Sequence, residues 1–257
     1  MTELAPGLTV IEHLARTRVL DTYEVFSAER ACSCVAKTLR PDRRGDASAA
    51  KALAAEGRLL MELAHPHIVR GYQLIAEPHP IVVMETLDGE TVAHLADRRG
   101  GLDADEVAWL GLHLASALRY LHGRGVLHLD VKPANVVADG GRAKLIDLSL
   151  ARPPGRYKRG LGTWCNLAPE QARGELLGPA ADVWGLGTVL HEATTGEPAF
   201  DSDEGYPQLD GPASRVDGPL ADAIASCLAP EAADRPPLPE LASRLAEHAP
   251  GARPWGA

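Results

Sequence analysis

The stretch His128-Leu129-Asp130-Val131-Lys132-Pro133-Ala134-Asn135 decides the fold of this chain, and Asp147 follows it twelve residues after Asn135. Within six residues it holds a carboxylate (Asp130), an amine (Lys132) and a carboxamide (Asn135). A carboxylate can orient a hydroxyl nucleophile, and a nearby amine can neutralise the charge of a phosphate. The stretch therefore predicts a phosphoryl-transfer centre.

The residues between Asn135 and Asp147 predict a β-hairpin. The apolar runs 136–138 and 143–146 are typical of short strands, and Gly140-Gly141 between them is typical of a tight turn. Such a hairpin returns Asp147 to the side of Asn135. Carboxylate and carboxamide oxygens suit Mg²⁺, which binds through one or two protein oxygens plus substrate phosphates. Asn135 and Asp147 are therefore the expected metal ligands.

These residues also carry a family resemblance. The octet resembles the catalytic loop of protein kinases, H-R-D-x-K-P-x-x-N, and Asp147-Leu148-Ser149 resembles their metal-binding D-F-G. The Lys132-Pro133 pair is similar to serine/threonine kinases rather than to tyrosine kinases or small-molecule kinases of the same fold. The resemblance is to the bacterial, Hanks-type serine/threonine kinases, and it spans residues from about 8 to about 248.

The resemblance implies an α+β, bilobal protein-kinase-like fold. Residues 1–87 would form a small β-rich N-lobe, and residues 88–257 a larger, mostly helical C-lobe, with a cleft between the lobes. Within the N-lobe, Cys34-Val35-Ala36-Lys37 resembles the V-A-I-K strand. A helix over residues 46–64, capped by Asp46, would carry the glutamate that pairs with its lysine.

The resemblance assigns ATP and Mg²⁺ as cofactors and marks the nucleotide-binding positions. Lys37 would contact the α- and β-phosphates and pair with Glu56, Met84 would be the gatekeeper, and Glu85 to Leu87 the hinge that binds adenine. The cofactor-binding residues are Lys37, Glu56, Ala36, Val25, Met84, Glu85, Leu87 and Val137.

The largest departure from the family lies in the glycine-rich loop. Aligning Val25-Phe26 with the end of that loop puts Arg18, Leu20 and Tyr23 where three glycines belong. Glycine allows the backbone to fold tightly over phosphates and offer its amides. We therefore expect a stiffer, bulkier lid that closes less fully on ATP, with Arg16 or Arg18 as a substitute donor.

In the second half of the chain, residues 91–99, 103–122, 182–195, 219–229 and 237–248 predict helices. Residues 151–159 predict a loop, and residues 250–257 a disordered tail.

Several residues of this half have contacts implied by the resemblance. Thr163 would hydrogen-bond Asp130 and Lys132 and is the third catalytic residue with them. Glu170 of the A-P-E segment would pair with Arg235 of D-R-P, and Asp182 would accept hydrogen bonds from the backbone around His128.

Regulation by loop phosphorylation is not expected. Leu129 stands where many kinases have the arginine that binds an activation-loop phosphate, and the loop 150–161 has one hydroxyl side chain, Tyr157. The leading hypothesis is a serine/threonine protein kinase that transfers the ATP γ-phosphate to a protein hydroxyl without loop phosphorylation. One alternative is a pseudokinase that binds nucleotide or partner proteins without phosphotransfer. A small-molecule kinase is disfavoured by Lys132-Pro133 and by Ala168-Pro169-Glu170.

Composition indicates where the protein is located and which kinds of partner it has. A formal net charge of −9 argues against a nucleic-acid partner, and no apolar run is long enough to span a bilayer. The four cysteines lack metal-ligand spacing and predict reduced thiols in a cytoplasmic protein. Expected partners are a protein substrate with Ser or Thr and a separate regulatory protein, with no membrane association.

Overall fold

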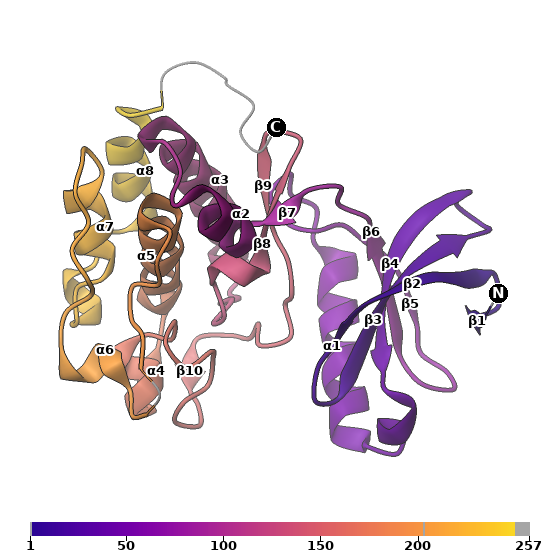
Figure 1. The fold of residues 1–257 in the computed structure, drawn as a ribbon. Coiled ribbons are helices and arrows are strands. Elements are labelled where there is room, and N and C mark those ends of the chain that lie inside the picture. Colours follow the sequence, from indigo (N-terminus) through magenta and orange to yellow (C-terminus); the bar gives the residue numbers. More distant parts are fainter. Residues whose placement is uncertain (1, 203, 250–257) are drawn as a thin grey trace. The chain divides into compact units, whose positions relative to one another are not determined.

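A computed structural model describes residues 2–202 and 204–249 of the chain, so the predicted tail over 250–257 lies outside the described residues. The chain divides into two compact units, Met1–Leu87 and Asp88–Ala257. The fold is α+β, with a β-rich first unit and a mainly helical second unit (Figure 1).

The first unit is a six-stranded antiparallel sheet with one long helix. The strand order is β1-β2-β3-β4-β6-β5. The strands are β1 (Glu3–Ala5), β2 (Leu8–Arg16), β3 (Leu20–Ser27), β4 (Cys32–Leu39), β5 (Gly71–Ile75) and β6 (Ile81–Glu85). The predicted strand over Cys34–Lys37 is confirmed as part of β4, and β6 is buried over its first four residues because it lies inside the sheet.

Helix α1 (Ala47–Glu62) packs on this sheet against β4, β5 and β6. The carboxylate of Asp46 accepts a hydrogen bond from the amide of Ala49 at 3.0 Å, so the predicted helix cap is confirmed. Leu53 and Leu60 of α1 are buried and belong to the apolar face of the helix.

The second unit is built around helix α5 (Pro179–Thr195), which is buried along most of its length. A helix that is apolar on all sides belongs in the centre of a domain. The other helices are α2 (Val92–Arg99), α3 (Ala104–His122), α4 (Pro169–Arg173), α6 (Pro207–Asp210), α7 (Ala221–Cys227) and α8 (Leu238–Ala246). Helices α2, α3 and α7 pack on α5, and α8 packs on α3. None of the helices in the described part of the chain is long and apolar enough to cross a membrane.

Two small sheets complete this unit. One has the order β7-β8-β9, with β7 (Glu90–Thr91), β8 (Val136–Asp139) and β9 (Arg142–Leu145), and the other pairs β10 (Gly155–Arg156) with β11 (Leu176–Leu177). The predicted hairpin is confirmed: Gly140 and Gly141 have φ of 53° and 79°, a conformation that most side chains disfavour.

Two sequence-based predictions are wrong, one of a loop and one of the start of a helix. Residues 151–159 do not form only a loop, because β10 pairs with β11 and Arg152 forms a β-bridge with Leu127. Helix α5 begins at Pro179, three residues before the predicted start at Asp182. Proline suits the first turn of a helix, where its missing N–H is not needed.

Candidate active site

The loop between α3 and β8 is held in place by one buried carboxylate. Asp182 of α5 accepts hydrogen bonds from the amides of His128 and Leu129, at 2.9 and 2.7 Å. The Nε2 atom of His122 lies 2.7 Å from the same carboxylate. The predicted role of Asp182 as an acceptor is confirmed, and these contacts offset the cost of burying its charge.

Three further features shape this loop. Burial lowers the pKa of His128, so its neutral ring can accept, at Nδ1, the amide hydrogen of Asp130 over 3.3 Å. Leu129 has a φ of 64°, a left-handed conformation that is uncommon for a leucine. Helix α5 approaches closely at Gly185, where a Cβ atom would lie 2.7 Å from the carbonyl oxygen of Val131.

The three predicted catalytic side chains contact one another. Thr163 donates its hydroxyl hydrogen to Asp130 Oδ1 at 2.7 Å and accepts a hydrogen bond from Lys132 Nζ at 2.6 Å. Lys132 Nζ also lies 3.2 Å from Asp130 Oδ2. The cluster thus combines a hydroxyl, a cation and a carboxylate, and the predicted contacts of Thr163 are confirmed.

Asn135 and Asp147 meet the requirements of a hard-cation site. The amide nitrogen of Asn135 donates to Asp130 at its carbonyl oxygen (2.9 Å) and at Oδ2 (3.0 Å), which leaves Oδ1 of Asn135 as the ligand atom. The amide of Ile146 donates to the carbonyl oxygen of Asn135 at 2.9 Å, and this bond brings the adjacent Asp147 to the same end of the hairpin.

The chemistry of this pair fits Mg²⁺. Asp147 has a φ of 61°, and its Oδ1 accepts from the amide of Ser149 at 3.1 Å. Among the described residues, no three His, Cys, Asp or Glu side chains form a metal-binding group. A cation here would take ligands from phosphate and water in addition, as Mg²⁺ does.

In the first unit, Lys37 and Glu56 form a buried ion pair. Lys37 Nζ lies 2.9 and 3.1 Å from the two carboxylate oxygens of Glu56. The side chains come from β4 and α1, and both are almost fully buried. The predicted contact between them is confirmed.

The other predicted cofactor-binding residues lie in strands of the two units or, for Leu87, at the end of the first unit. Val25 and Ala36 lie in the core on one face of the first unit's sheet, and Met84 is buried in β6. Glu85 ends β6 and Leu87 ends the unit. In the second unit, Val137 lies in β8 and is nearly buried.

The turn between β2 and β3 is held by hydrogen bonds between its own polar groups and by Arg40. Thr17 Oγ1 accepts from the amides of Val19 and Leu20, at 3.4 and 3.0 Å, and the amide of Thr17 donates to the carbonyl oxygen of Leu20. Arg40 donates to the carbonyl oxygens of Thr17 and Arg18. Two of the amides that a glycine-rich loop would turn toward a phosphate are thus bonded within the turn.

A buried carboxylate, Asp21, ties the two strands of this hairpin together. Arg16 binds both of its oxygens, at 2.7 and 3.0 Å, and His13 Nε2 and the Tyr23 hydroxyl lie at 3.0 and 3.2 Å. The hydrogen bonds from Arg16 are the main reason that the pKa of Asp21 falls to about 2. Because the guanidinium of Arg16 is bound to Asp21, Arg18 remains as the candidate substitute donor.

Gln171 of α4 connects the catalytic loop to the segment that follows Asp147. Its Nε2 donates to the carbonyl oxygens of Leu129 (3.0 Å) and Leu161 (2.7 Å), and its Oε1 accepts from the amide of Ala168 (2.9 Å). The sequence pattern gives no signal for Gln171, Asp21 or Thr17, because their contacts depend on how separate segments pack.

A buried ion pair anchors the same segment to the end of the unit. Arg235 binds Glu170 through two hydrogen bonds of 2.7 and 2.8 Å, as predicted. Arg235 also donates to the carbonyl oxygens of Ala180, Ala229 and Pro230.

Comparison with known proteins agrees with this geometry. A family model described as "Protein kinase domain" matches residues 12–245. The chain belongs to the protein kinase family.

The similar kinases are bacterial serine/threonine-protein kinases. PkaA of Streptomyces coelicolor is 33% identical over 260 residues, which are 94% of this chain and 48% of PkaA. PknB of Mycobacterium leprae is 34% identical over 179 residues, which are 65% of this chain and 29% of PknB, and PknB of Mycobacterium tuberculosis is 34% identical over 180 residues with the same coverage. The chain therefore spans half or less of the length of these curated relatives.

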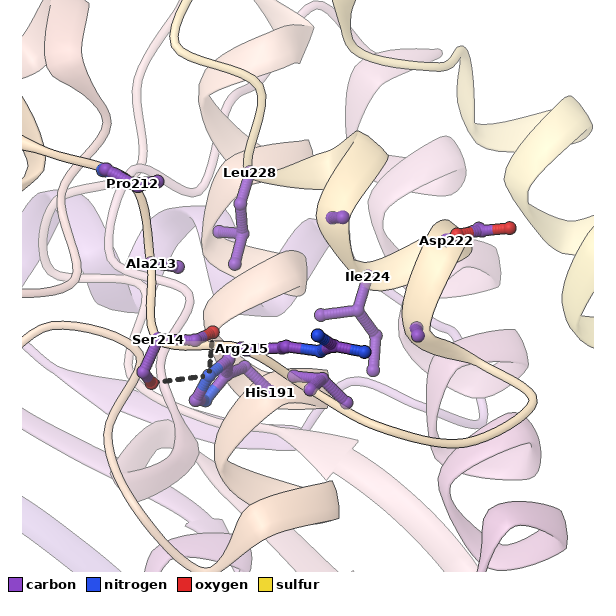
Figure 2. A pocket seen from close by; sticks show the side chains of 11 residues that line it. His191, Pro212, Ala213, Ser214, Arg215, Asp222, Ile224 and Leu228 are labelled. Carbon is purple, nitrogen blue, oxygen red and sulfur yellow. Dashed lines mark hydrogen bonds between the residues drawn. The ribbon is translucent and has the colours of Figure 1, made fainter.

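A cavity of about 400 Å³ lies elsewhere in the second unit of this kinase domain, and none of the predicted site residues lines it. It lies between α5, the 212–216 segment and α7. Figure 2 shows Arg215 extended between His191 and Ile224, with His191 bonded to Ser214. Arg215 is paired with Asp217 at 3.0 Å, so the cavity presents no unpaired charge from this arginine.

Proposed function

We propose that this chain is a serine/threonine protein kinase that transfers the γ-phosphate of ATP to a hydroxyl group of a protein. The observation that carries the proposal is the contact of Asp130 and Lys132 with the hydroxyl of Thr163. A hydroxyl already bonded to this carboxylate and this amine marks where a substrate hydroxyl would be oriented. In this proposal the unit ending at Leu87 is the N-lobe, and the unit beginning at Asp88 is the C-lobe.

Each polar residue has one role in the proposed reaction. Asp130 orients the substrate hydroxyl and accepts its hydrogen, and Lys132 stabilises the charge on the transferring phosphoryl group. Lys37, held by Glu56, binds the α- and β-phosphates of ATP. Asn135 and Asp147 would hold Mg²⁺, which supplies charge neutralisation to the phosphates when bound.

We also propose that this activity does not require phosphorylation of the 150–161 loop. Leu129 cannot bind a phosphate, and the loop already has the contacts that a phosphate would have to create. Gln171 bonds the catalytic loop to Leu161, and the Tyr157 hydroxyl donates to the carbonyl oxygen of Pro153 at 2.6 Å. These neutral hydrogen bonds support a loop that is ordered without a modification.

The lid supports a second candidate function, a pseudokinase that binds partners without phosphotransfer. The amides of Val19 and Leu20 are bonded to Thr17 and are not directed at a phosphate. Against this candidate, all the residues whose side chains would act on phosphate, metal or nucleophile are present: Lys37, Glu56, Asp130, Lys132, Asn135 and Asp147.

Thermal unfolding with ATP tests the nucleotide site that the kinase proposal requires, and phosphotransfer then separates the two candidates. We expect ATP with Mg²⁺ to raise the Tm of the wild type, since a ligand at about a hundred times its Kd adds about 2.7 kcal/mol to the stability of the folded state. Asp147→Ala should remove the magnesium-dependent part of the shift, whereas Asp217→Asn, at an exposed carboxylate, should keep it.

Phosphotransfer to a Ser/Thr peptide mixture is measured next, with Asp130→Asn as the inactive control. Loss of the general base typically lowers a rate by about 10² to 10⁴-fold. A Tm shift without phosphotransfer would favour the pseudokinase, and no shift at millimolar ATP would contradict a working nucleotide site.

A further inference from the structure

Four exposed cations lie together on the segment between Asp147 and α5. They are Arg156, Lys158, Arg159 and Arg173, and they are called the activation-segment patch below. Residues 148–178, between Asp147 and α5, hold five cationic residues (Arg152 besides these four) against two carboxylates, Glu170 and Glu175, although the formal net charge of the chain is −9. Positive charge is therefore concentrated on this segment.

Two hydrogen bonds bring Arg156 and Arg159 to the end of α4 that carries Arg173. Arg159 donates to the carbonyl oxygen of Ala172 at 2.9 Å, and Arg156 to that of Gly174 at 3.4 Å, so both lie against the end of α4, where Arg173 is located. Figure 1 shows β10, α4 and α6 close together in the second unit.

Two aromatic rings extend the patch toward Thr163. The guanidinium of Arg159 lies 5.3 Å from the centre of the Tyr206 ring, and that ring lies 5.9 Å from the ring of Trp164. Trp164 is 45% exposed, so a bound chain could reach its ring. Trp164 directly follows Thr163, whose hydroxyl bonds Asp130, and the cations are thus connected to the proposed catalytic centre.

The cations of the patch have no carboxylate partner in the described part of the chain. The ion pairs there involve other cations, such as Arg235 with Glu170 and Arg215 with Asp217. The bonds that Arg156 and Arg159 do make are to carbonyl oxygens, which leave the positive charge uncompensated. Glu175, on the same segment, is exposed and is the nearest carboxylate in sequence to Arg173.

We propose that the activation-segment patch binds an acidic segment of the protein substrate, so that this kinase prefers Ser or Thr residues flanked by Asp and Glu. The preference for certain phosphorylation sites rests on the proposed kinase function. Binding of the acidic segment to the patch does not depend on that function. The substrate carboxylates would pair with Arg156, Lys158 and Arg173, while the hydroxyl to be phosphorylated lies at Asp130.

A short acidic segment fits the charges better than a nucleic acid does. A nucleic acid carries its negative charge far beyond the patch, where the rest of this acidic chain repels it. An acidic peptide contacts only the patch and the catalytic centre, and complementary charge also speeds its association.

Peptide binding tests the proposal without requiring catalysis. The probe is a fluorescent peptide with glutamates on both sides of a single alanine, which stands in place of the phosphoacceptor, and the comparison peptide has glutamine for each glutamate. We expect the acidic peptide to bind about tenfold more tightly, because several surface ion pairs act together, and the difference to shrink at high salt. The double variant Arg156→Glu, Lys158→Glu should lose the difference, and Arg119→Glu, at an exposed cation on α3, should keep it.

The outcomes separate this inference from the proposed function. Equal binding of the two peptides would overturn the preference, and so would a single-stranded oligonucleotide that binds as tightly as the acidic peptide. Phosphorylation of the matching serine peptides is measured in parallel. Selective binding that the double variant abolishes would support the patch, even where no phosphate is transferred and the proposed kinase function therefore fails.

Discussion

At the scale of single residues, Gln171 joins the 128–135 loop to the segment that follows Asp147. The side chain of Leu129 is apolar and offers that segment no hydrogen bond. The carboxamide of Gln171 joins them instead, through the carbonyl oxygens of Leu129 and Leu161. Because a carboxamide has both donor and acceptor atoms, it also accepts from the amide of Ala168.

We predict that Gln171→Ala lowers kcat by more than its loss of stability alone would explain. Losing buried hydrogen bonds should cost about 1–3 kcal/mol of unfolding free energy, and the catalytic loop should lose its fixed position. The measurements are chemical denaturation and the kcat for a peptide at saturating ATP.

Gln208→Ala is a matched control for this variant. Gln208 is also buried and donates to two carbonyl oxygens of the same segment, those of Trp164 and Leu167, but it does not contact the catalytic loop. An equal drop in kcat for both variants would mean that Gln171 has only a structural role.

Tyr157→Phe should keep full activity, because the contacts of Gln171 still hold the 150–161 loop. Loss of kinase activity in this variant would count against independence from loop phosphorylation.

At the scale of elements, the β2–β3 hairpin is stabilised by charge and not by glycine. The strands pair with register shifts between Val10 and Glu12 and between His13 and Ala15, which accommodate extra residues in β2. Asp21 of β3 then lies within hydrogen-bonding distance of three side chains, those of His13, Arg16 and Tyr23. A hairpin with these internal contacts has fewer conformations available than a glycine-rich loop.

The stability that Asp21 contributes should depend on pH. The pKa of Asp21 is lowered from 3.8 to about 2, so its contribution is complete above about pH 4 and is lost as the pH falls toward 2. We predict that Asp21→Asn lowers the urea midpoint at pH 7, and that the difference from wild type shrinks between pH 4 and pH 2. Asp217→Asn, at an exposed carboxylate, should show no such difference. A constant difference down to pH 2 would contradict the assignment.

At the scale of the whole molecule, each unit brings together residues that are far apart in sequence. In the second unit, Asp182 of α5 holds the loop at His128, and Arg235 binds Glu170, which is 65 residues away. In the first unit, α1 and β4 together form the Lys37–Glu56 pair. The proposed site residues are thus positioned by buried polar contacts that complete the packing of each unit.

We predict that Arg235→Met strongly destabilises the second unit, by about 3–5 kcal/mol, because it leaves the buried charge of Glu170 without a partner. Combining it with Glu170→Leu should recover much of the loss, since neither charge is then buried. Chemical denaturation of the two variants measures this effect. If the double variant is less stable than Arg235→Met, the loss comes from packing and from the carbonyl contacts of Arg235, and not from an unpaired charge.

The sequence by itself was enough to predict the α+β fold, the hairpin that returns Asp147, the Asp46 cap of α1, and the pairs Lys37–Glu56 and Glu170–Arg235. These features depend on local patterns or on motifs whose spacing is distinctive. Only the tertiary structure decided the contacts of Gln171, the cluster around Asp21 and the continuity of the activation-segment patch. Their side chains meet through strand register and through the packing of separate segments, and a side chain's neighbours across such a contact leave no periodic signal in the sequence.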